Sequence, residues 1–168
     1  PHLIEVREAG GAVRQLTSEK IFINTGTRPA QPKIPGLDEV RALNSETIQQ
    51  LDVLPRHLVI VGGSYVALEF AQMFRRFGSE VTVLERAPQL LKREDADVVE
   101  ALAKLLREEG INLQVNCVVE RIEKDGEGVS IVLTADGKST RVSGSHLLLA
   151  LGRSPNTGEL NLMAAGVE

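Results

Sequence analysis

The sequence predicts an α/β fold: a doubly wound parallel sheet that carries an inserted three-stranded antiparallel meander. Three observations predict it. Between residues 57 and 115, short apolar runs typical of buried strands alternate with amphipathic helical stretches. Strand-like segments at about 118–124, 129–134 and 139–143 follow, joined by the hairpin turns "DGEG" and "ADGK". The apolar run "HLLLALG" then returns as a further buried parallel strand.

The segment before this region is organised differently. Residues 3–7 and the stretch "AVRQLT" predict two strands joined by a turn, and "KIFINTG" predicts a third strand that ends at Gly26. The next stretch, "TRPAQPKIPGLDEV", is rich in proline, which blocks both a helix and a strand ladder. We therefore expect an extended connector there, and a domain boundary.

Three helices are expected within the α/β region. The stretch "SETIQQL" predicts a short helix with Ser45 as its N-cap. Residues 65–77 predict a helix with apolar side chains at helical spacing, namely Val66, Phe70, Phe74 and Phe77. The stretch "EDADVVEALAKLLREEG" predicts another, ended by Gly110, with an apolar face made of Val98, Val99, Leu102, Leu105 and Leu106.

Composition excludes several classes of function. The net charge of -4 gives no basic field to attract nucleic acid, and no apolar run approaches the ~20 residues of a membrane span. The single cysteine, Cys117, excludes an internal disulfide and a cysteine-rich zinc site, and the histidines have no metal-ligand spacing. We expect no metal, a cytoplasmic location, and Cys117 as a small core residue rather than a reactive thiol.

The stretch "HLVIVGGSYVALEF" nearly matches the glycine-rich fingerprint of dinucleotide-binding loops. Gly62 meets the need for a tight turn after the strand, and Ala67 meets the need for close helix–strand packing. Ser64 stands where the second glycine allows close approach to a pyrophosphate, but its hydroxyl can donate to a phosphate oxygen. The helix N-terminus behind it supplies free N–H groups. The alternative is a strand-to-helix turn whose glycines serve geometry alone.

An acidic residue follows at the sequence spacing that is typical of a residue in contact with the ribose. Glu85 ends the strand "EVTVLE", 23 positions after Gly62, where an acid accepts from the ribose 2′-hydroxyl. An acid there repels the 2′-phosphate of NADP, whereas Arg86 can accept that phosphate. The choice between NAD and NADP therefore stays open, leaning to NAD. Each residue has a plainer alternative as an exposed charge at a strand end.

Three motifs in order resemble a known family: "KIFINTGTRPAQPKIPG", "LVIVGGSYVALEFAQMFRRFGSEVTVLER" and "LLLALGRSPNT". The chain resembles the flavin-dependent pyridine nucleotide–disulfide oxidoreductases, which include dihydrolipoamide dehydrogenase, glutathione reductase and mercuric reductase. The resemblance covers about residues 20–168 well and 1–19 weakly. It implies a Rossmann-like FAD/NAD(P)-binding fold, and Ser64 resembles the serine that mercuric reductase-like members carry at this position.

The resemblance also implies a domain plan. Residues 1–26 are then the end of a split FAD domain, 27–41 the crossover linker, 42–155 the NAD(P)H-binding domain and 156–168 the start of the return to the FAD domain. The redox disulfide, the FAD phosphate loop and the dimerisation domain of the family have no counterpart in this sequence. We therefore expect a fragment of a longer flavoenzyme, inactive in isolation and homodimeric when full-length.

Residue roles follow from the resemblance only where motifs match. Tyr65 resembles the aromatic residue that covers the flavin where nicotinamide will stack, and Val66 follows it in the same loop. Glu69 resembles the glutamate that faces the nicotinamide carboxamide and pairs with a lysine of the FAD domain; without that lysine it should be exposed. The cofactor-binding set implied is Gly62, Gly63, Ser64, Tyr65, Val66, Glu69, Glu85, Arg86, Val119, Gly152 and Arg153.

Other members of this set also have specific alternatives. Tyr65 covers the flavin, or is a tyrosine at the helix N-terminus that packs on the sheet. Val119 resembles the apolar residue beside the adenine ring, or is a plain strand residue. Gly152 allows close approach of the cofactor, and Arg153 either reaches the pyrophosphate or holds the interdomain seam. No catalytic residue is expected in this sequence itself.

The function implied is to bind NAD(P)H in a reductase that passes hydride to FAD, and then electrons to a disulfide or another acceptor. The expected partners are the FAD domain and the C-terminal dimerisation domain of the same protein. One alternative is an NADH oxidase or ferredoxin reductase-like enzyme of the same fold without a redox disulfide. The other is a stand-alone nucleotide-binding module.

Overall fold

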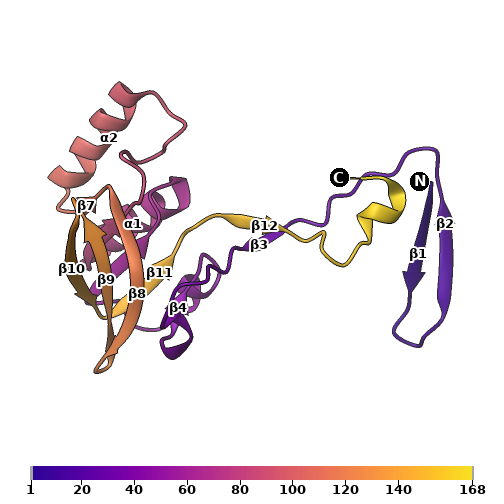
Figure 1. Ribbon diagram of the computed structural model, residues 1–168, viewed down its shortest axis with the longest axis horizontal. Helices are drawn as coiled ribbons and strands as arrows, with labels where there is room; N and C mark the ends of the chain where they lie inside the picture. The colour runs from indigo at the N-terminus through magenta and orange to yellow at the C-terminus, as the bar shows by residue number, and fades with distance from the viewer. Residues whose placement is uncertain (1, 168) are drawn as a thin grey trace. The chain divides into compact units, whose positions relative to one another are not determined.

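A computed structural model of the chain describes residues 2–167. By their contacts the residues divide into two units: Pro29–Gly152, and the two flanking segments up to Arg28 and from Arg153 onward. The first of these, which we call the central unit, contains both predicted sheets and both long helices (Figure 1). The flanking segments form short strand pairs and one 3₁₀ helix.

A five-stranded sheet forms the middle of the central unit, and every pairing in it is parallel. The strands follow the spatial order β4, β11, β5, β6, β7, so the chain enters near one edge and its last strand inserts beside the first ones. Their bounds are Ala42–Leu43 (β4), His57–Val61 (β5), Glu80–Leu84 (β6), Asn112–Gln114 (β7) and His146–Leu149 (β11). This arrangement confirms the predicted parallel α/β sheet.

Two helices, α1 (Tyr65–Phe77) and α2 (Ala96–Glu108), contribute to the first hydrophobic core. Alternate strand residues such as Leu58 and Ile60 of β5 pack into this core and are fully buried. Side chains alternate across a strand, so their neighbours point to the opposite face. Within residues 2–167 no helix has the length and apolar character needed to cross a membrane.

The opposite face of the parallel sheet packs against an antiparallel meander. Its strands are β8 (Cys117–Asp125), β9 (Gly128–Ala135) and β10 (Lys138–Gly144), in the spatial order β10, β9, β8. Val59 and Val61 of β5 share a second core with Ile131 and Leu133 of β9. The central unit therefore has three layers, and the inserted meander is confirmed (Figure 1).

The buried face of α1 differs from the predicted one. Phe74 is buried and Phe70 is half-buried, but Val66 and Phe77 are exposed, at 41% and 63%. The residues that contact the sheet are Ala67, Leu68, Ala71 and Phe74. The two alanines bring the helix close to the sheet, which turns the larger apolar residues on either side toward the surface.

The predicted face of α2 is wrong in the same way. Val99 and Leu106 are buried and Leu102 packs partly against the core, but Val98 and Leu105 are exposed, at 58% and 45%. The list of five apolar residues covers a wider arc than the single sheet surface can bury. Gly110, with a φ of +85°, follows the helix end as predicted.

The predicted connector, residues 27–41, is not extended throughout. A 3₁₀ helix, η1 (Leu37–Glu39), interrupts it, and Ile34, Leu37 and Val40 pack against the second core. Gly36 explains the turn: it has a φ of +79°, and a Cβ there would lie 1.9 Å from the carbonyl oxygen of Ile122. The later part of the predicted connector is therefore anchored to the meander.

The short helix after β4 is the 3₁₀ helix η2 (Thr47–Gln50), and Ser45 does not cap it. The side-chain oxygen of Asn44 accepts instead, from the backbone N–H groups of Glu46 and Thr47 at 2.8 and 2.9 Å. The side chain of asparagine often accepts from the backbone N–H groups of the residues that follow it in a turn. In the pattern "NSET" this asparagine stands one position before Ser45, the predicted cap.

The flanking segments contain the predicted hairpin of β1 (Leu3–Arg7) and β2 (Val13–Thr17). The predicted strand at residues 20–26 is wrong, because no ladder forms there and Phe22 is 87% exposed. A shorter strand, β3 (Thr27–Pro29), pairs instead with β12 (Arg153–Pro155), and η3 (Leu162–Ala165) follows. Apolar residues alone do not make a strand, because a ladder also needs a partner strand.

Glu109, which follows α2, ties the two helices together. Arg76 donates to its carboxylate at 2.7 Å and Gln72 at 2.9 Å, and these contacts come from α1. The hydrogen bond from Arg76 holds the pKa of Glu109 below its ordinary value.

This contact predicts a pH dependence. A carboxyl whose folded-state pKa is lowered stabilises the fold above its unfolded pKa, and that contribution is lost as pH falls through the folded value. We expect Glu109→Gln to reduce the free energy of unfolding at pH 7 and to make little difference at low pH, as measured by urea unfolding across this range. Glu100→Gln, at an exposed glutamate of α2, is the control. A loss that is equal at both pH values would contradict the prediction.

Candidate functional site

The glycine-rich turn lies where three parallel strands end side by side. The last residue of β5, Val61, pairs with both Leu84 of β6 and Leu149 of β11. The next residue, Gly62, has a φ of +116°, and its N–H donates to the carbonyl oxygen of Leu84 at 2.8 Å. A Cβ on Gly62 would lie 2.4 Å from the carbonyl oxygen of Ala150. Only glycine fits this position, because both the backbone angle and the close approach exclude a side chain.

Gly63 is in direct contact with Glu85. The N–H of Gly63 donates to one carboxylate oxygen of Glu85 at 2.6 Å, and the N–H of Ala87 donates to the other at 2.7 Å. A Cβ on Gly63 would lie 2.9 Å from the Cβ of Glu85 and 2.8 Å from Leu90. The glutamate therefore braces the glycine turn against the end of β6, a contact that the sequence motif does not reveal. Its half-buried carboxylate also has further lone pairs that can accept.

Ser64 precedes α1 in extended backbone and is exposed. Its hydroxyl does not cap the helix, since no side-chain hydrogen bond to the first turn forms. The first N–H groups of a helix have no partner within the helix, so those that follow Ser64 can donate hydrogen bonds to an anion. The turn and the helix N-terminus thus offer donors next to the acceptor, Glu85.

Tyr65 and Glu69 occupy the exposed side of the first turns of α1. The Tyr65 hydroxyl donates to a carboxylate oxygen of Glu94 at 2.5 Å, and this hydrogen bond raises the pKa of the phenol. Glu69 is exposed and has no hydrogen bond or ion pair with any residue in the described part of the chain. The sequence places Glu94 at the start of the predicted helix and does not reveal its contact with Tyr65; in the structure α2 begins two residues later, at Ala96.

The remaining predicted residues lie in different surroundings. Arg86 is exposed beside Glu85, whereas Val119 is half-buried and packs against the second core. Its neighbour Val118 is 47% exposed on the other side of β8. Gly152 has a φ of +105° with open space around it. Among the residues named in this paragraph, Val119 is the one whose surroundings are those of a core residue.

The Arg153 side chain holds two strands together. Its Nε donates to the Thr27 hydroxyl at 2.6 Å and its Nη2 donates to the Thr27 carbonyl oxygen at 2.8 Å, so β12 is fixed to β3. Both residues belong to the flanking segments, so these contacts do not decide between the two predicted roles of Arg153, reaching the pyrophosphate or holding the interdomain seam.

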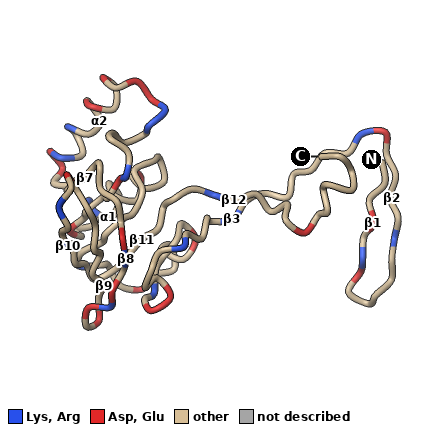
Figure 2. Tube along the Cα trace, in the orientation of Figure 1, with Lys and Arg blue, Asp and Glu red and all other residues tan. Residues whose placement is uncertain are grey.

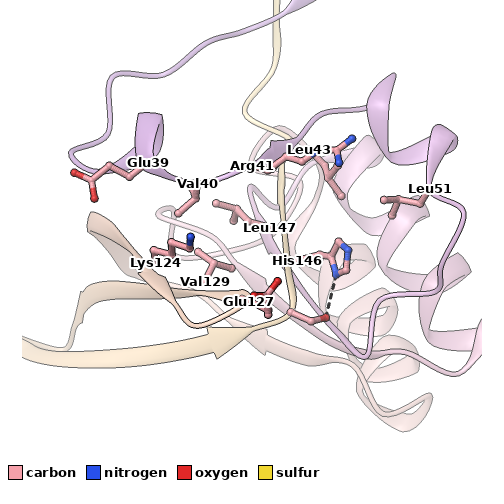
Figure 3. A pocket seen from close by; sticks show the side chains of 12 residues that line it. Glu39, Val40, Arg41, Leu43, Leu51, Lys124, Glu127, Val129, His146 and Leu147 are labelled. Carbon is pink, nitrogen blue, oxygen red and sulfur yellow. Dashed lines mark hydrogen bonds between the residues drawn. The ribbon is translucent and has the colours of Figure 1, made fainter.

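A cavity of about 330 Å³ lies at the other end of the sheet, near the amino ends of β4 and β11 (Figure 3). Apolar residues such as Val40, Leu43 and Leu147 line it together with charged or titratable side chains, namely Glu39, Arg41, Lys124, Glu127 and His146. Burial, and then the nearby charge of Arg41, lower the pKa of His146. None of the predicted cofactor residues lines this cavity. Among residues 2–167, no group of three or more His, Cys, Asp or Glu side chains could hold a metal ion.

The arrangement of these elements indicates a class of domain. A parallel sheet with helices on one face, a glycine turn at the carboxyl ends of its strands and an acid at the end of the next strand are typical of dinucleotide-binding folds. A family model described as pyridine nucleotide-disulphide oxidoreductase matches residues 2–168. The chain belongs to this family.

Individual relatives agree with this assignment. Mercuric reductase of Bacillus cereus is 41% identical over 154 residues, which cover 92% of this chain and 24% of that protein. The probable pyridine nucleotide-disulfide oxidoreductase RclA of Escherichia coli is 38% identical over 167 residues, covering 99% of this chain and 37% of that protein. The chain therefore spans about a quarter to somewhat over a third of the length of these curated relatives.

Solved structures also match. The HOCl-induced flavoprotein disulfide reductase RclA from Escherichia coli has a TM-score of 0.82 and 38% identity, over 99% of this chain and 37% of that one. LpdA from Mycobacterium tuberculosis has a TM-score of 0.83 and 29% identity, over 98% of this chain and 35% of that one.

Proposed function

We propose that residues 42–155 bind NAD(P)H within a flavoprotein reductase that passes hydride to FAD and then electrons to a disulfide or another acceptor. The observation that carries this proposal is the junction of Gly62, Gly63 and Glu85. There a turn too tight for any side chain leads into a helix N-terminus directly beside a half-buried carboxylate. Relatives named mercuric reductase and flavoprotein disulfide reductase support the reaction class.

The residues present fit a dinucleotide. Ser64 and the first turn of α1 would bind the pyrophosphate, with Gly62 making the tight turn and the open backbone at Gly152 allowing close approach. Glu85 would accept from a ribose hydroxyl with the lone pairs that its two backbone contacts leave over. The remaining contacts are assigned to Arg86 and Val119 for the adenosine half, to Tyr65, Val66 and Glu69 for the nicotinamide half, and to Arg153 for the pyrophosphate or the strand junction.

When bound, the nicotinamide supplies hydride chemistry, and this chain's residues bind and orient it. The Glu85 carboxylate favours NAD, because it repels a 2′-phosphate, while the exposed Arg86 is the residue that would accept NADP. We propose NAD as the preferred cofactor, with FAD bound by the full-length protein. The 168-residue chain alone is expected to bind nucleotide weakly and to have no turnover.

The rest of the protein supplies the partners. We propose that residues 1–26 and 156–168 belong to its FAD domain, and that a C-terminal domain makes a homodimer in the cytoplasm. An NADH oxidase or ferredoxin reductase-like enzyme lacking a redox disulfide remains the second candidate, because no part of the chain carries a cysteine pair. FAD absorbance of the full-length protein, and a CxxxxC motif in it, separate these possibilities from a stand-alone nucleotide module.

Calorimetric titration of the chain with NADH and NADPH tests the proposal. We expect heat of binding for both, with the lower Kd for NADH. We expect Ser64→Ala to raise the Kd about fivefold, since one hydrogen bond to a phosphate is worth about 1 kcal/mol. Ser139→Ala, at an exposed serine of β10, is the matched control and should leave the Kd unchanged. Absence of binding to both the chain and the full-length protein would contradict the proposal.

A further inference from the structure

The cavity at the amino ends of β4 and β11 lies at the end of the sheet opposite to the glycine turn. All of its lining residues belong to the central unit, and none of them is a predicted nucleotide contact. Its volume of about 330 Å³ is within the range of sites that hold small molecules, which begins at ~300 Å³. Its apolar wall consists of Val40, Leu43, Leu51, Val129 and Leu147 (Figure 3). The cavity can therefore take a small ligand that has an apolar part.

Two cationic side chains line this cavity without an ion-pair partner. Arg41 directly precedes β4 and Lys124 lies near the end of β8, and both are exposed. Neither side chain forms a hydrogen bond or an ion pair with a residue of the described range 2–167. Charges of both signs lie on the turn between β8 and β9 and on the segment before β4 (Figure 2). An anion in the cavity would therefore meet donors that the fold itself does not use.

A histidine lines the cavity beside these cations. His146 begins β11 and is half-buried, and its Nδ1 lies 3.1 Å from the hydroxyl oxygen of Ser145. The backbone of His57 fixes that hydroxyl, because its N–H donates to the oxygen and its carbonyl oxygen accepts from it, both at 3.0 Å. The imidazole ring is thus held in place, and its Nε2 has no hydrogen bond to any residue that the structure describes.

A bound anion would change the protonation of this histidine. Burial, and then the charge of Arg41, lower the pKa of His146, so its ring is neutral at pH 7. An anion held beside both side chains would counter this lowering, because it favours the charged imidazolium. Both nitrogens of an imidazolium donate, so Nε2 would then donate to the anion.

The acidic side chains at the cavity limit the charge that its ligand can carry. Glu39 and Glu127 also line it, and both are exposed. Figure 3 shows the carboxylate of Glu39 at one side of the cavity, turned away from the other labelled side chains. Glu127 then opposes one of the two cations, Arg41 and Lys124, which leaves an excess of one positive charge. This balance favours a ligand with a single negative charge over a phosphate or a dicarboxylate.

We propose that this cavity is a second ligand site, and that it binds a small aliphatic monocarboxylate. Arg41 pairs with the carboxylate, which matches the planar fork of a guanidinium group, and His146 donates to it through Nε2. The short hydrocarbon chain of the ligand packs on Val40, Leu43 and Leu147. The site is separate from the nucleotide contacts and does not depend on the proposed function.

Hexanoate and hexanamide are the probes that test this site. Their chains have equal length, but only hexanoate carries a charge. The titration of the 168-residue chain is followed by the Hε1 resonances of its three histidines, of which His146 is assigned by its loss in His146→Gln. We expect hexanoate to shift the His146 resonance to saturation, with a Kd about tenfold lower than that of hexanamide. Equal affinities, or a His146 resonance that hexanoate does not move, would overturn the proposal.

Variants separate the carboxylate contact from the apolar one. Arg41→Met keeps an aliphatic stem and removes the charge, and we expect it to raise the Kd for hexanoate about tenfold, because hydrogen bonds from a charged group are lost. Arg107→Met, at an exposed arginine of α2, is the matched control and should leave this Kd unchanged. Ser64→Ala, at the glycine turn, should also leave it unchanged. An unchanged Kd in Arg41→Met, or weaker hexanoate binding in Ser64→Ala, would place the carboxylate elsewhere and overturn the proposal.

The site also predicts a pH dependence of hexanoate binding. The charged groups that line the cavity with His146 are Glu39, Arg41, Lys124 and Glu127, and His57 adjoins it through Ser145 while its own ring lies against the Thr82 hydroxyl. Because hexanoate favours the imidazolium of His146, binding takes up a proton, and the Kd should fall as pH falls from about 7.5 to about 5.5. His146→Gln should remove this dependence and retain the effect of Arg41→Met. A Kd that does not change with pH in wild type would overturn the proposed pairing of Arg41 and His146.

Discussion

Gly62→Ala is expected to reduce the free energy of unfolding by about 4 kcal/mol. This is the sum of the cost of a left-handed backbone angle and the cost of overpacking. The backbone at Gly62 has a φ of +116°, and an alanine Cβ would meet the carbonyl oxygen of Ala150 at 2.4 Å. That oxygen belongs to the backbone directly after β11, so relief requires the end of a central strand to move. Urea unfolding followed by circular dichroism measures the loss.

Gly78→Ala is the matched control. Gly78 has a similar φ of +108°, but a Cβ there has no atom within 4 Å. This variant should cost about 1–2 kcal/mol, the backbone contribution alone. Equal losses in the two variants would show that the approach of the Ala150 carbonyl is not a tight contact, and would weaken the case that the turn is built for close packing of strand ends.

Glu85→Ala is expected to have the second-largest effect, because it acts on both stability and binding. The substitution leaves the N–H groups of Gly63 and Ala87 without their acceptor, and hydrogen bonds to a charged group contribute about 1.5–3 kcal/mol each. Since the site is only half-buried, water replaces part of this, and we expect a loss of about 2 kcal/mol. The Kd for NADH should rise as well, because the proposed ribose acceptor is removed.

Glu85→Gln separates the two contacts. Its amide keeps one accepting oxygen and turns an NH₂ group toward the second backbone N–H, so we expect a loss of stability close to that of alanine. Glu100→Ala, at an exposed glutamate of α2, is the control for loss of a carboxylate. Unfolding free energies of both Glu85 variants that equal wild type would contradict the bracing role, whatever the result with NADH.

The sequence was sufficient for the parts of the fold in which local pattern and tertiary packing agree. The buried strands β5, β6 and β11 are predominantly apolar, as expected for a parallel sheet covered on both faces. The meander was predicted because "DGEG" and "ADGK" are hairpin turns between alternating strands. Helix faces were less accurate: Val66 and Phe77 have the right spacing but lie outside the arc that the sheet can cover.

The predicted strand at residues 20–26 failed for a different reason. Phe22 and Ile23 are strongly apolar, yet they are 87% and 46% exposed. An apolar pattern shows which side chains of a segment favour burial. It does not show whether other elements pack over that segment.

For the candidate site, the sequence motif located Gly62, Ser64 and Glu85 because their roles are tied to fixed spacings. It did not reveal that Glu85 accepts from the backbone of Gly63, nor that Glu94 accepts from Tyr65. Both contacts join loops that are far apart in sequence, and loop geometry depends on how the strand ends meet in space. Exposed charges outside a regular element carry no spacing that could be read in advance.

Cys117, the one cysteine, is 2% exposed at the start of β8, where its thiol donates to the carbonyl oxygens of Glu85 and Gln114. Burial raises the pKa of this thiol, so the reactive thiolate is scarce while the fold is closed. The rate at which an alkylating reagent modifies the native chain then reports how often the structure opens around Cys117, whose N–H donates to the carbonyl oxygen of Glu85 just after β6. Modification of Cys117 therefore measures local unfolding beneath Glu85, the residue proposed to accept from a ribose hydroxyl, and nucleotide binding at the proposed site should slow it.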